Sequence, residues 1–126
     1  MKISQGVLNH YIGYVTDFYI SDNNIPPDEL TGYYDYVVDL KTDAIRHEDL
    51  EPLRLGINYL LCHPEIDLDS HGGMYPYDDE EVREILMYIR SVIWSDNSEV
   101  NCQEVRDVEL IDMNKFDWWQ MRKVKV

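Results

Sequence analysis

The sequence predicts a mainly α-helical fold with about four helices and a small β element near the C-terminus, which makes the fold class α+β. Apolar residues recur at helical spacing over much of the first 94 residues, whereas beyond residue 100 they partly alternate with charged ones. The chain has 126 residues, and its hydrophobic content of 44% argues against disorder. Residues 1–126 are therefore expected to form a single acidic globular domain.

Two helices are expected in the first third of the chain. The first lies within residues 4–20, where apolar and aromatic side chains recur at helical spacing and Ser4 can act as the N-cap. Tyr and Val are also common in strands, so a strand is the alternative there. The second begins at Pro26–Glu29, which places prolines and acids at a helix start, and extends to about Leu40. Residues 41–46 are expected to form a connection.

Two further helices are expected in the middle of the chain. One begins at Asp49 and ends at His63–Pro64, because a residue before proline is disfavoured in the helical conformation. The other, at about residues 79–94, has the clearest pattern, and Asp78 and Asp79 can cap its first turn. Its apolar side chains fall at i, i+3, i+4, i+7 and i+11, at positions Val82, Ile85, Leu86, Ile89 and Ile93.

The C-terminal segment is less regular. Its partial alternation predicts a hairpin or a pair of strands, and a helix over Cys102–Ile111 is the alternative. The last five residues include three bases, Arg122, Lys123 and Lys125. These bases could bind the acidic face of the same chain, or they could belong to an exposed, frayed terminus.

The cysteines and the hydropathy of the chain predict a cytoplasmic protein. Cys62 and Cys102 fit no metal or redox spacing, so they are expected to be two buried thiols in a reducing cytosol. No apolar run approaches the ~20 residues of a membrane span. The first six residues lack the apolar core of a signal peptide. No membrane partner is expected.

The charge of the chain indicates the kind of partner. With 11 basic and 25 acidic residues, the formal net charge is −14. Such a field repels nucleic acid and attracts basic proteins, so direct binding of DNA or RNA is not expected. The chain also contains ten tyrosines, a residue that recognition surfaces favour because its rigid apolar ring carries a polar tip.

No motif in the sequence indicates catalysis. The four histidines are scattered, and a Gly-rich phosphate loop, a nucleophile elbow and an HExxH motif are all missing from the sequence. We therefore expect no enzymatic activity and no cofactor. A calcium loop is an alternative for residues 67–78, with Asp67, Asp69 and Asp78 as candidate ligands. This loop departs from the usual pattern, because its fifth position is His71 and its tenth is Pro76.

An acidic and aromatic surface is the favoured functional site. Between Pro64 and Glu81 there are seven carboxylates and no Lys or Arg. Tyr75 and Tyr77 are expected to anchor a partner, and nearby acids to steer and pair with its bases. The expected acids are Asp69, Asp78, Asp79, Glu80 and Glu84. The alternative is an acidic face that is merely solvated.

The middle of the chain, about residues 63–93, resembles the colicin and pyocin DNase immunity proteins. The resemblance is carried by His63–Pro64, an acidic loop, Tyr75–Pro76, Asp78–Asp79 and the helix that follows. Here Met74 stands in place of a first tyrosine, His71 stands where an aspartate would be, and the loop is longer. Residues from about 95 onward have no counterpart. The resemblance implies a small acidic four-helix protein that binds a toxic nuclease and blocks it.

The predicted function is thus that of a non-catalytic inhibitor, a bacteriocin or toxin immunity protein that binds a basic nuclease or nucleic-acid-binding complex. A phage-encoded anti-restriction or anti-CRISPR DNA mimic is the first alternative, since high negative charge, small size and abundant Tyr are similar in character to that class. A Ca²⁺-binding or other small acidic interaction protein is the second.

Overall fold

The computed structural model describes residues 1–71, 73–94 and 100–123, apart from the side chains of Asp69 and Ser70. It is mainly helical, as the sequence predicts, with more than the four helices expected. The α-helices are α1 (Gln5–Gly13), α2 (Thr16–Asn23), α3 (Tyr34–Arg46), α4 (Leu50–Cys62), α5 (Asp79–Trp94) and α6 (Lys115–Lys123). Short 3₁₀ helices are η1 (Leu30–Tyr33), η2 (Leu68–His71) and η3 (Cys102–Val105), and the strands are β1 (Lys2–Ser4) and β2 (Glu109–Ile111).

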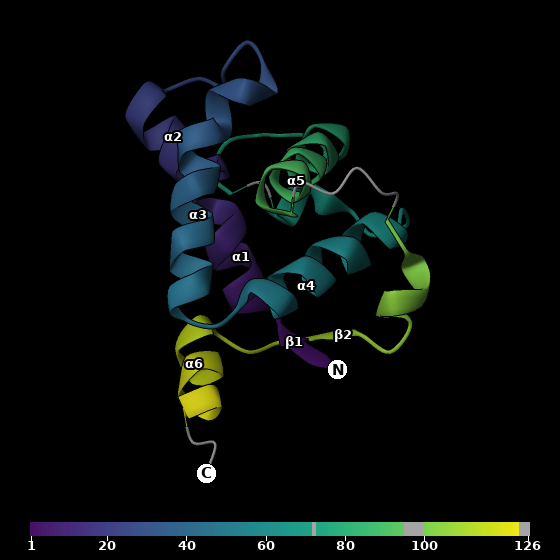
Figure 1. The fold of residues 1–126 in the computed structure, drawn as a ribbon. Helices are drawn as coiled ribbons and strands as arrows, with labels where there is room; N and C mark the ends of the chain where they lie inside the picture. The colour runs from purple at the N-terminus through teal and green to yellow at the C-terminus, as the bar shows by residue number, and fades with distance from the viewer. Residues whose placement is uncertain (72, 95–99, 124–126) are drawn as a thin grey trace.

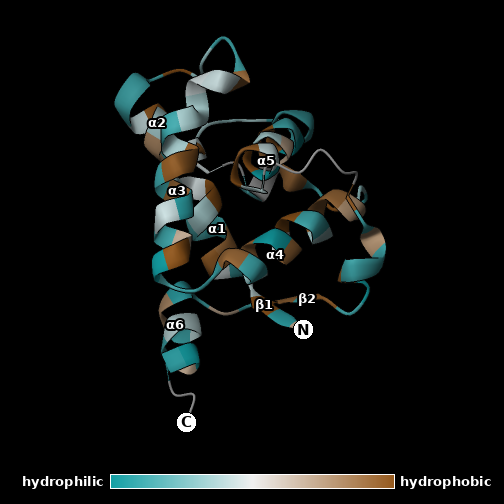
Figure 2. Cartoon of the chain, in the orientation of Figure 1, coloured by the Kyte–Doolittle hydropathy of each residue, from teal (hydrophilic) through white to brown (hydrophobic). Residues whose placement is uncertain are grey.

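Helix α1 lies at the centre of the arrangement. It contacts α2, α3, α4, α6, β1 and η2, while α5 packs on both α3 and α4 (Figure 1). Brown and teal segments alternate along α3 and α4 in Figure 2, as expected of helices with one buried face. The core is built from apolar side chains of α1, α3, α4 and α5 together with one indole of α6. Its fully buried members include Ile12, Val37, Leu40, Ile57, Leu60, Leu86 and Ile89.

Local sequence signals account for three helix boundaries. The Ser4 hydroxyl oxygen accepts a 3.0 Å hydrogen bond from the Val7 amide, which confirms Ser4 as the N-cap of α1. Helix α4 begins after Asp49 and ends before His63–Pro64, as predicted. Before α5, the Asp78 carboxylate accepts from the Glu81 amide at 2.8 Å, and the Glu81 carboxylate accepts from the Asp78 amide at 3.1 Å. This reciprocal cap, together with the buried apolar stripe, explains why α5 is the best predicted element.

Three predicted boundaries in the first half of the chain are wrong. The segment 4–20 is helical but forms two helices, because α1 ends at Gly13 and α2 starts at Thr16. Pro26–Glu29 precedes η1, so the longer helix begins only at Tyr34. Residues 41–46 are not a connection. They continue α3, because the buried side of that helix extends beyond Leu40 to Asp43 and Ala44.

The β element exists, but it is not a hairpin. Strand β2 pairs in parallel with β1, in the register Lys2 with Glu109, Ile3 with Leu110 and Ser4 with Ile111. Its partner therefore comes from the opposite end of the chain, which an alternating pattern cannot reveal. Residues 115–123 form α6 rather than a strand, and only the first part of the alternative helix over Cys102–Ile111 is helical, as η3.

The expectation of two free thiols is wrong, because Cys62 and Cys102 form a disulfide. Helix α4 contacts η3, which places the two Cα atoms 5.7 Å apart, within the range that a disulfide spans. Disulfides are rare in a reducing cytosol, so this bond removes one argument for a cytoplasmic location, which stays a prediction. Within the described residues, no helix has the length and apolar character needed to cross a membrane.

Two glycines of α1, Gly6 and Gly13, provide a matched test of how closely α1 packs on the segment before α6. A Cβ on Gly6 would lie 2.6 Å from the Met113 carbonyl oxygen and 2.8 Å from Asn114 Cα, both backbone atoms, whereas at Gly13 the nearest atom is 3.8 Å away. We expect Gly6→Ala to lower the free energy of unfolding by about 1–3 kcal/mol, because α1 must separate from the segment before α6. Gly13→Ala should be neutral or stabilise by up to about 1 kcal/mol. Urea unfolding monitored by far-UV circular dichroism measures the free energy of unfolding of both variants. Equal values for Gly6→Ala and Gly13→Ala would contradict the close packing at Gly6.

Candidate acidic groove on helix α5

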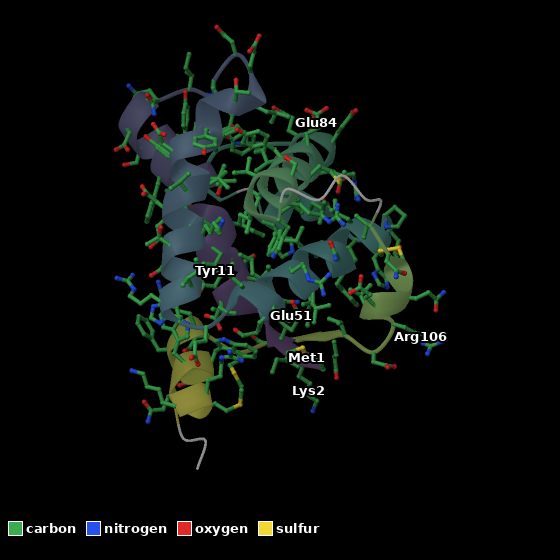
Figure 3. The ribbon with its side chains drawn as sticks, in the orientation of Figure 1. Met1, Lys2, Tyr11, Glu51, Glu84 and Arg106 are labelled. Carbon is green, nitrogen blue, oxygen red and sulfur yellow. A yellow bond between two sulfur atoms is a disulfide. The ribbon has the colours of Figure 1, made fainter. Side chains whose placement is uncertain are left out.

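The outward face of α5 positions the candidate site. Because Val82, Ile85, Leu86 and Ile89 are buried, the residues between them on the helix face solvent. Each fully buried apolar side chain stabilises the fold by about 1.5–3 kcal/mol, so the helix has a strongly favoured rotation about its axis. The exposed face presents Glu80, Glu84, Met87 and Ser91, at i, i+4, i+7 and i+11. Glu84 is labelled on α5 in Figure 3, across the view from Met1 and Lys2.

A shallow open groove lies between this face and η1. Its apolar lining includes Leu30, which is 36% exposed, Met87, which is 47% exposed, and the half-buried Tyr88. The exposed acids Glu80 and Glu84 line it as well. We call this surface the acidic groove and define it by its lining residues, which are Leu30, Glu80, Arg83, Glu84, Met87, Tyr88 and Ser91.

A second hollow continues the acidic groove around Leu30 and Glu84. Its additional acids are Asp28, Glu29 and Glu81, and Tyr33 and Tyr77 lie at its base. The two phenol oxygens are 2.9 Å apart and buried. Burial is the largest cause that raises the pKa of both phenols, and the charge of Glu81 contributes to the same effect. Because their pKa values are raised, the two phenols carry no charge at neutral pH, and the negative charge of this hollow comes from its carboxylates.

Helix α3 extends the apolar part of the surface beyond the acidic groove. Tyr34 is 52% exposed and Val38, one turn further along α3, is 39% exposed. Burial raises the pKa of Tyr88, and the charge of the Tyr34 phenol adds to this shift. Asp35 and Asp39 are exposed on the same helix. The whole face thus combines exposed apolar side chains with carboxylates around them.

One cation lines the acidic groove, and it has a partner. Arg83 Nη2 lies 3.6 Å from Asp79 Oδ2, an ion pair one turn apart on α5. Asp79 is half-buried and also accepts a 2.8 Å hydrogen bond from the Leu68 amide, which fixes its position. The positive charge of Arg83 is therefore compensated within the fold, and Glu80 and Glu84 set the charge of the acidic groove.

The predicted acids are only partly brought together. Glu80 and Glu84 lie at the acidic groove, whereas Asp78 is exposed, caps α5 and lines a separate open hollow with Asp79 and residues 64–67. Asp79 is used within the fold, as described above. Asp69 belongs to η2, and its side chain lies outside the described part of the structure.

The two predicted tyrosine anchors are not equally placed. Tyr77 is 4% exposed and its hydroxyl pairs with Tyr33, so it belongs to the core and does not offer a surface anchor. Tyr75 is half-buried, with its ring 4.8 Å from that of Tyr77. Sequence reasoning missed Leu30 and Met87 as site residues. The buried stripe of α5 assigns Met87 to the opposite, exposed face of that helix, whereas Leu30 lies on η1, where no such stripe assigns its face.

The loop before α5 is held by contacts with the first two helices. His71 Nδ1 lies 2.5 Å from Asn9 Oδ1, and the Met74 amide donates to Asp17 Oδ1 at 2.8 Å. Gly73 has φ of 73°, and a Cβ there would lie 2.0 Å from the same Asp17 oxygen, so glycine is needed. These contacts account for the turn without a metal ion.

The calcium alternative gains no support from the described side chains. Across residues 1–71, 73–94 and 100–123, with the side chains of Asp69 and Ser70 left aside, no three His, Cys, Asp or Glu side chains are placed to hold a metal ion. Asp69, the central ligand of the predicted loop, is not among the side chains described. The calcium loop of Asp67, Asp69 and Asp78 therefore stays a prediction, as do the expected lack of a cofactor and of enzymatic activity.

Comparisons with known proteins do not identify the acidic groove. No family model matches the chain, and no curated protein or solved structure matches it at a significant level. The resemblance of residues 63–93 to the immunity proteins is thus a resemblance of short motifs. The function has to be argued from the shape and charge of the surface itself.

Burial of His71 predicts a pH dependence of stability. Burial lowers the pKa of His71, so the folded chain keeps this ring neutral at pH values where the unfolded chain protonates it. The stabilising effect is present above the ordinary histidine pKa of about 6.5 and is lost as the pH falls below it. Between pH about 7.5 and about 5.5, we expect wild type to lose more unfolding free energy than His71→Gln. Urea titrations at the two pH values measure this, and equal losses would show that His71 does not carry the dependence.

Proposed function

We propose that this protein is a non-catalytic inhibitor that binds a basic protein acting on nucleic acid and blocks its substrate surface, as an immunity protein does for a toxic nuclease. The observation that carries the proposal is the acidic groove, where the exposed apolar side chains of Leu30 and Met87 share one hollow with the carboxylates of Glu80 and Glu84. An exposed apolar strip with a polar rim is the usual anatomy of a protein-binding surface. Its negative rim selects partners rich in Lys and Arg.

The two kinds of side chain contribute differently to binding. Met87 and Leu30 can be desolvated at the centre of an interface, where a few buried anchors supply most of the binding free energy. Glu80 and Glu84 lie at the edge, where charge mainly increases the association rate. Nuclease surfaces that bind the phosphate backbone are basic, and carboxylates at one-turn spacing on α5 provide a complementary charge. The net charge of −14 adds long-range attraction.

A DNA-mimicking inhibitor of a restriction enzyme or CRISPR complex is the second candidate. Acids one turn apart on two neighbouring helices favour it, namely Asp35 and Asp39 on α3 and Glu80 and Glu84 on α5. Both candidates use acidic surface against a basic partner. They differ in the partner, which affinity capture from the native host would identify.

Matched substitutions in the acidic groove test the proposal once a partner has been captured. Met87→Ala should mainly speed dissociation, by about tenfold or more, if the side chain is a buried anchor worth at least about 1.4 kcal/mol. Glu84→Lys should mainly slow association, and added salt should reduce that difference because it screens the charges. Surface plasmon resonance separates the two rates.

The control for the charge change is Glu109→Lys. Glu109 is an exposed acid on β2, far along the molecule from α5 (Figure 1), so its reversal alters the net charge by the same amount without touching the acidic groove. We expect a smaller effect on association than for Glu84→Lys. Equal effects of the two reversals, or unchanged binding by Met87→Ala and Glu84→Lys, would place the interface elsewhere. A captured partner that is neither basic nor directed at nucleic acid would refute the function.

A further inference from the structure

A small pocket with cationic walls lies between the end of α3 and α6. It is lined by Arg46, His47, Glu48, Trp119, Arg122 and Lys123, which we call the basic pocket. The whole chain has 11 Lys and Arg residues against 25 acids, yet three of those bases line this one site. Figure 1 shows α6 beneath α3, away from α5 and η1, so the basic pocket is separate from the acidic groove.

Two buried carboxylates behind the basic pocket hold its guanidinium groups. Asp43, whose side chain is 5% exposed, forms an ion pair with Arg46, whose side chain is 70% exposed. Asp49 is fully buried and lies 3.2 Å from Nε of Arg122. The negative charges are thus inside the protein and the positive charges are at the surface. A guanidinium has five N–H donors, more than these contacts use, so donors remain for a ligand.

An aromatic wall makes the basic pocket rigid. The rings of His47 and Trp119 stack with centroids 4.1 Å apart and planes 13° from parallel. The indole N–H of Trp119 donates to Asp49 Oδ2 at 2.8 Å, which fixes the ring, and the backbone carbonyl of Glu48 accepts from Arg122. The walls are therefore already held in place, and a rigid site loses less entropy when a ligand binds.

Glu48 is in a backbone conformation that favours glycine. Its φ is 58°, and it occupies the left-handed position of the turn that ends α3. In that turn the Asp49 amide bonds the Ala44 carbonyl and the Glu48 amide bonds the Ile45 carbonyl, the pattern in which glycine is usual. A non-glycine residue there costs roughly 1–2 kcal/mol, and such strain is concentrated at functional sites. The strained residue lines the basic pocket.

We propose that the basic pocket binds an oxyanion, either a phosphate or a carboxylate group. Arg presents planar paired donors that match both groups, and Lys123 adds an exposed ammonium. The net charge of the whole chain opposes an anion only weakly, because charges more than about 8 Å away are screened at physiological salt. Among the described residues that line the basic pocket, Arg46, Arg122 and Lys123 are positively charged and Glu48 is negatively charged. The carboxylates of Asp43 and Asp49, which pair with Arg46 and Arg122, are buried behind these cations.

Titration of the isotopically labelled 126-residue chain with inorganic phosphate, and separately with acetate, tests the proposal by NMR. Sodium chloride at matched ionic strength is the reference. We expect saturable shifts of the Trp119 indole N–H and of the amides of residues 46–48 with at least one of the two anions, and none with chloride. A response to phosphate alone indicates a phosphorylated ligand, and a response to acetate alone indicates a carboxylate.

Three variants and one control decide whether the basic pocket is the site. Lys123→Gln and Arg46→Gln should lower the affinity for the anion at least several-fold. Glu48→Gln should raise that affinity, because the opposing carboxylate is removed. Lys123 is exposed, so its replacement leaves the fold intact even if Arg46→Gln disturbs Asp43. Arg106→Gln, at the end of η3 and distant from α6 in Figure 3, should bind as wild type does. Shifts that do not saturate, or equal affinities in Lys123→Gln and Arg106→Gln, would overturn the proposal.

Discussion

The buried carboxylate of Asp49 is the interaction on which the lower half of the structure depends. It is fully buried, accepts hydrogen bonds from the Tyr11 hydroxyl at 2.5 Å and from the indole N–H groups of Trp118 at 3.0 Å and Trp119 at 2.8 Å, and forms an ion pair with Nε of Arg122 at 3.2 Å. An unpaired buried carboxylate would cost several kcal/mol, so the fold requires these donors to be in place. Because they come from α1 and α6, a single side chain at the start of α4 joins three helices.

The two candidate surfaces differ in how the helices that carry them are held in place. The acidic groove is built on α5, whose position is set mainly by a long apolar stripe, to which Arg90 Nε adds a buried 3.0 Å hydrogen bond to Asn58 Oδ1 on α4. Helix α6 buries one side chain, Trp118, while Phe116 and Met121 remain exposed. Its position therefore depends strongly on polar and aromatic contacts, namely the hydrogen bonds of its two indoles to Asp49, the stacking of Trp119 on His47 and the contact of Lys115 with His10. The basic pocket is formed by the same contacts that attach α6, so an anion bound there would stabilise that attachment.

Features set by neighbouring residues were predictable from the sequence, and features set by distant residues were not. The stripe of α5, its Asp78 cap and the end of α4 at His63–Pro64 follow from local periodicity and proline sterics, and all three are confirmed. Asp49 was recognised only as a helix start, because its donors lie elsewhere in the chain. The Cys62–Cys102 disulfide and the β1–β2 pairing likewise join segments that no local pattern connects.

Of the predicted site, Glu80 and Glu84 lie at the acidic groove because they are on the face of α5 opposite its buried stripe. Tyr77 lies in a polar segment of the sequence, yet its side chain is buried and its hydroxyl pairs with that of Tyr33.

Amide hydrogen exchange of Asp49→Asn tests most directly whether this carboxylate holds α6. Asparagine preserves the size of the side chain but loses the charge and places an amide among N–H donors. We expect exchange in Lys115–Lys123 to accelerate by about tenfold or more, equivalent to at least about 1.4 kcal/mol of lost local stability, while α5 stays protected. The exposed Asp39→Asn change serves as the control. Unchanged protection of α6 in Asp49→Asn would show that this carboxylate does not hold α6.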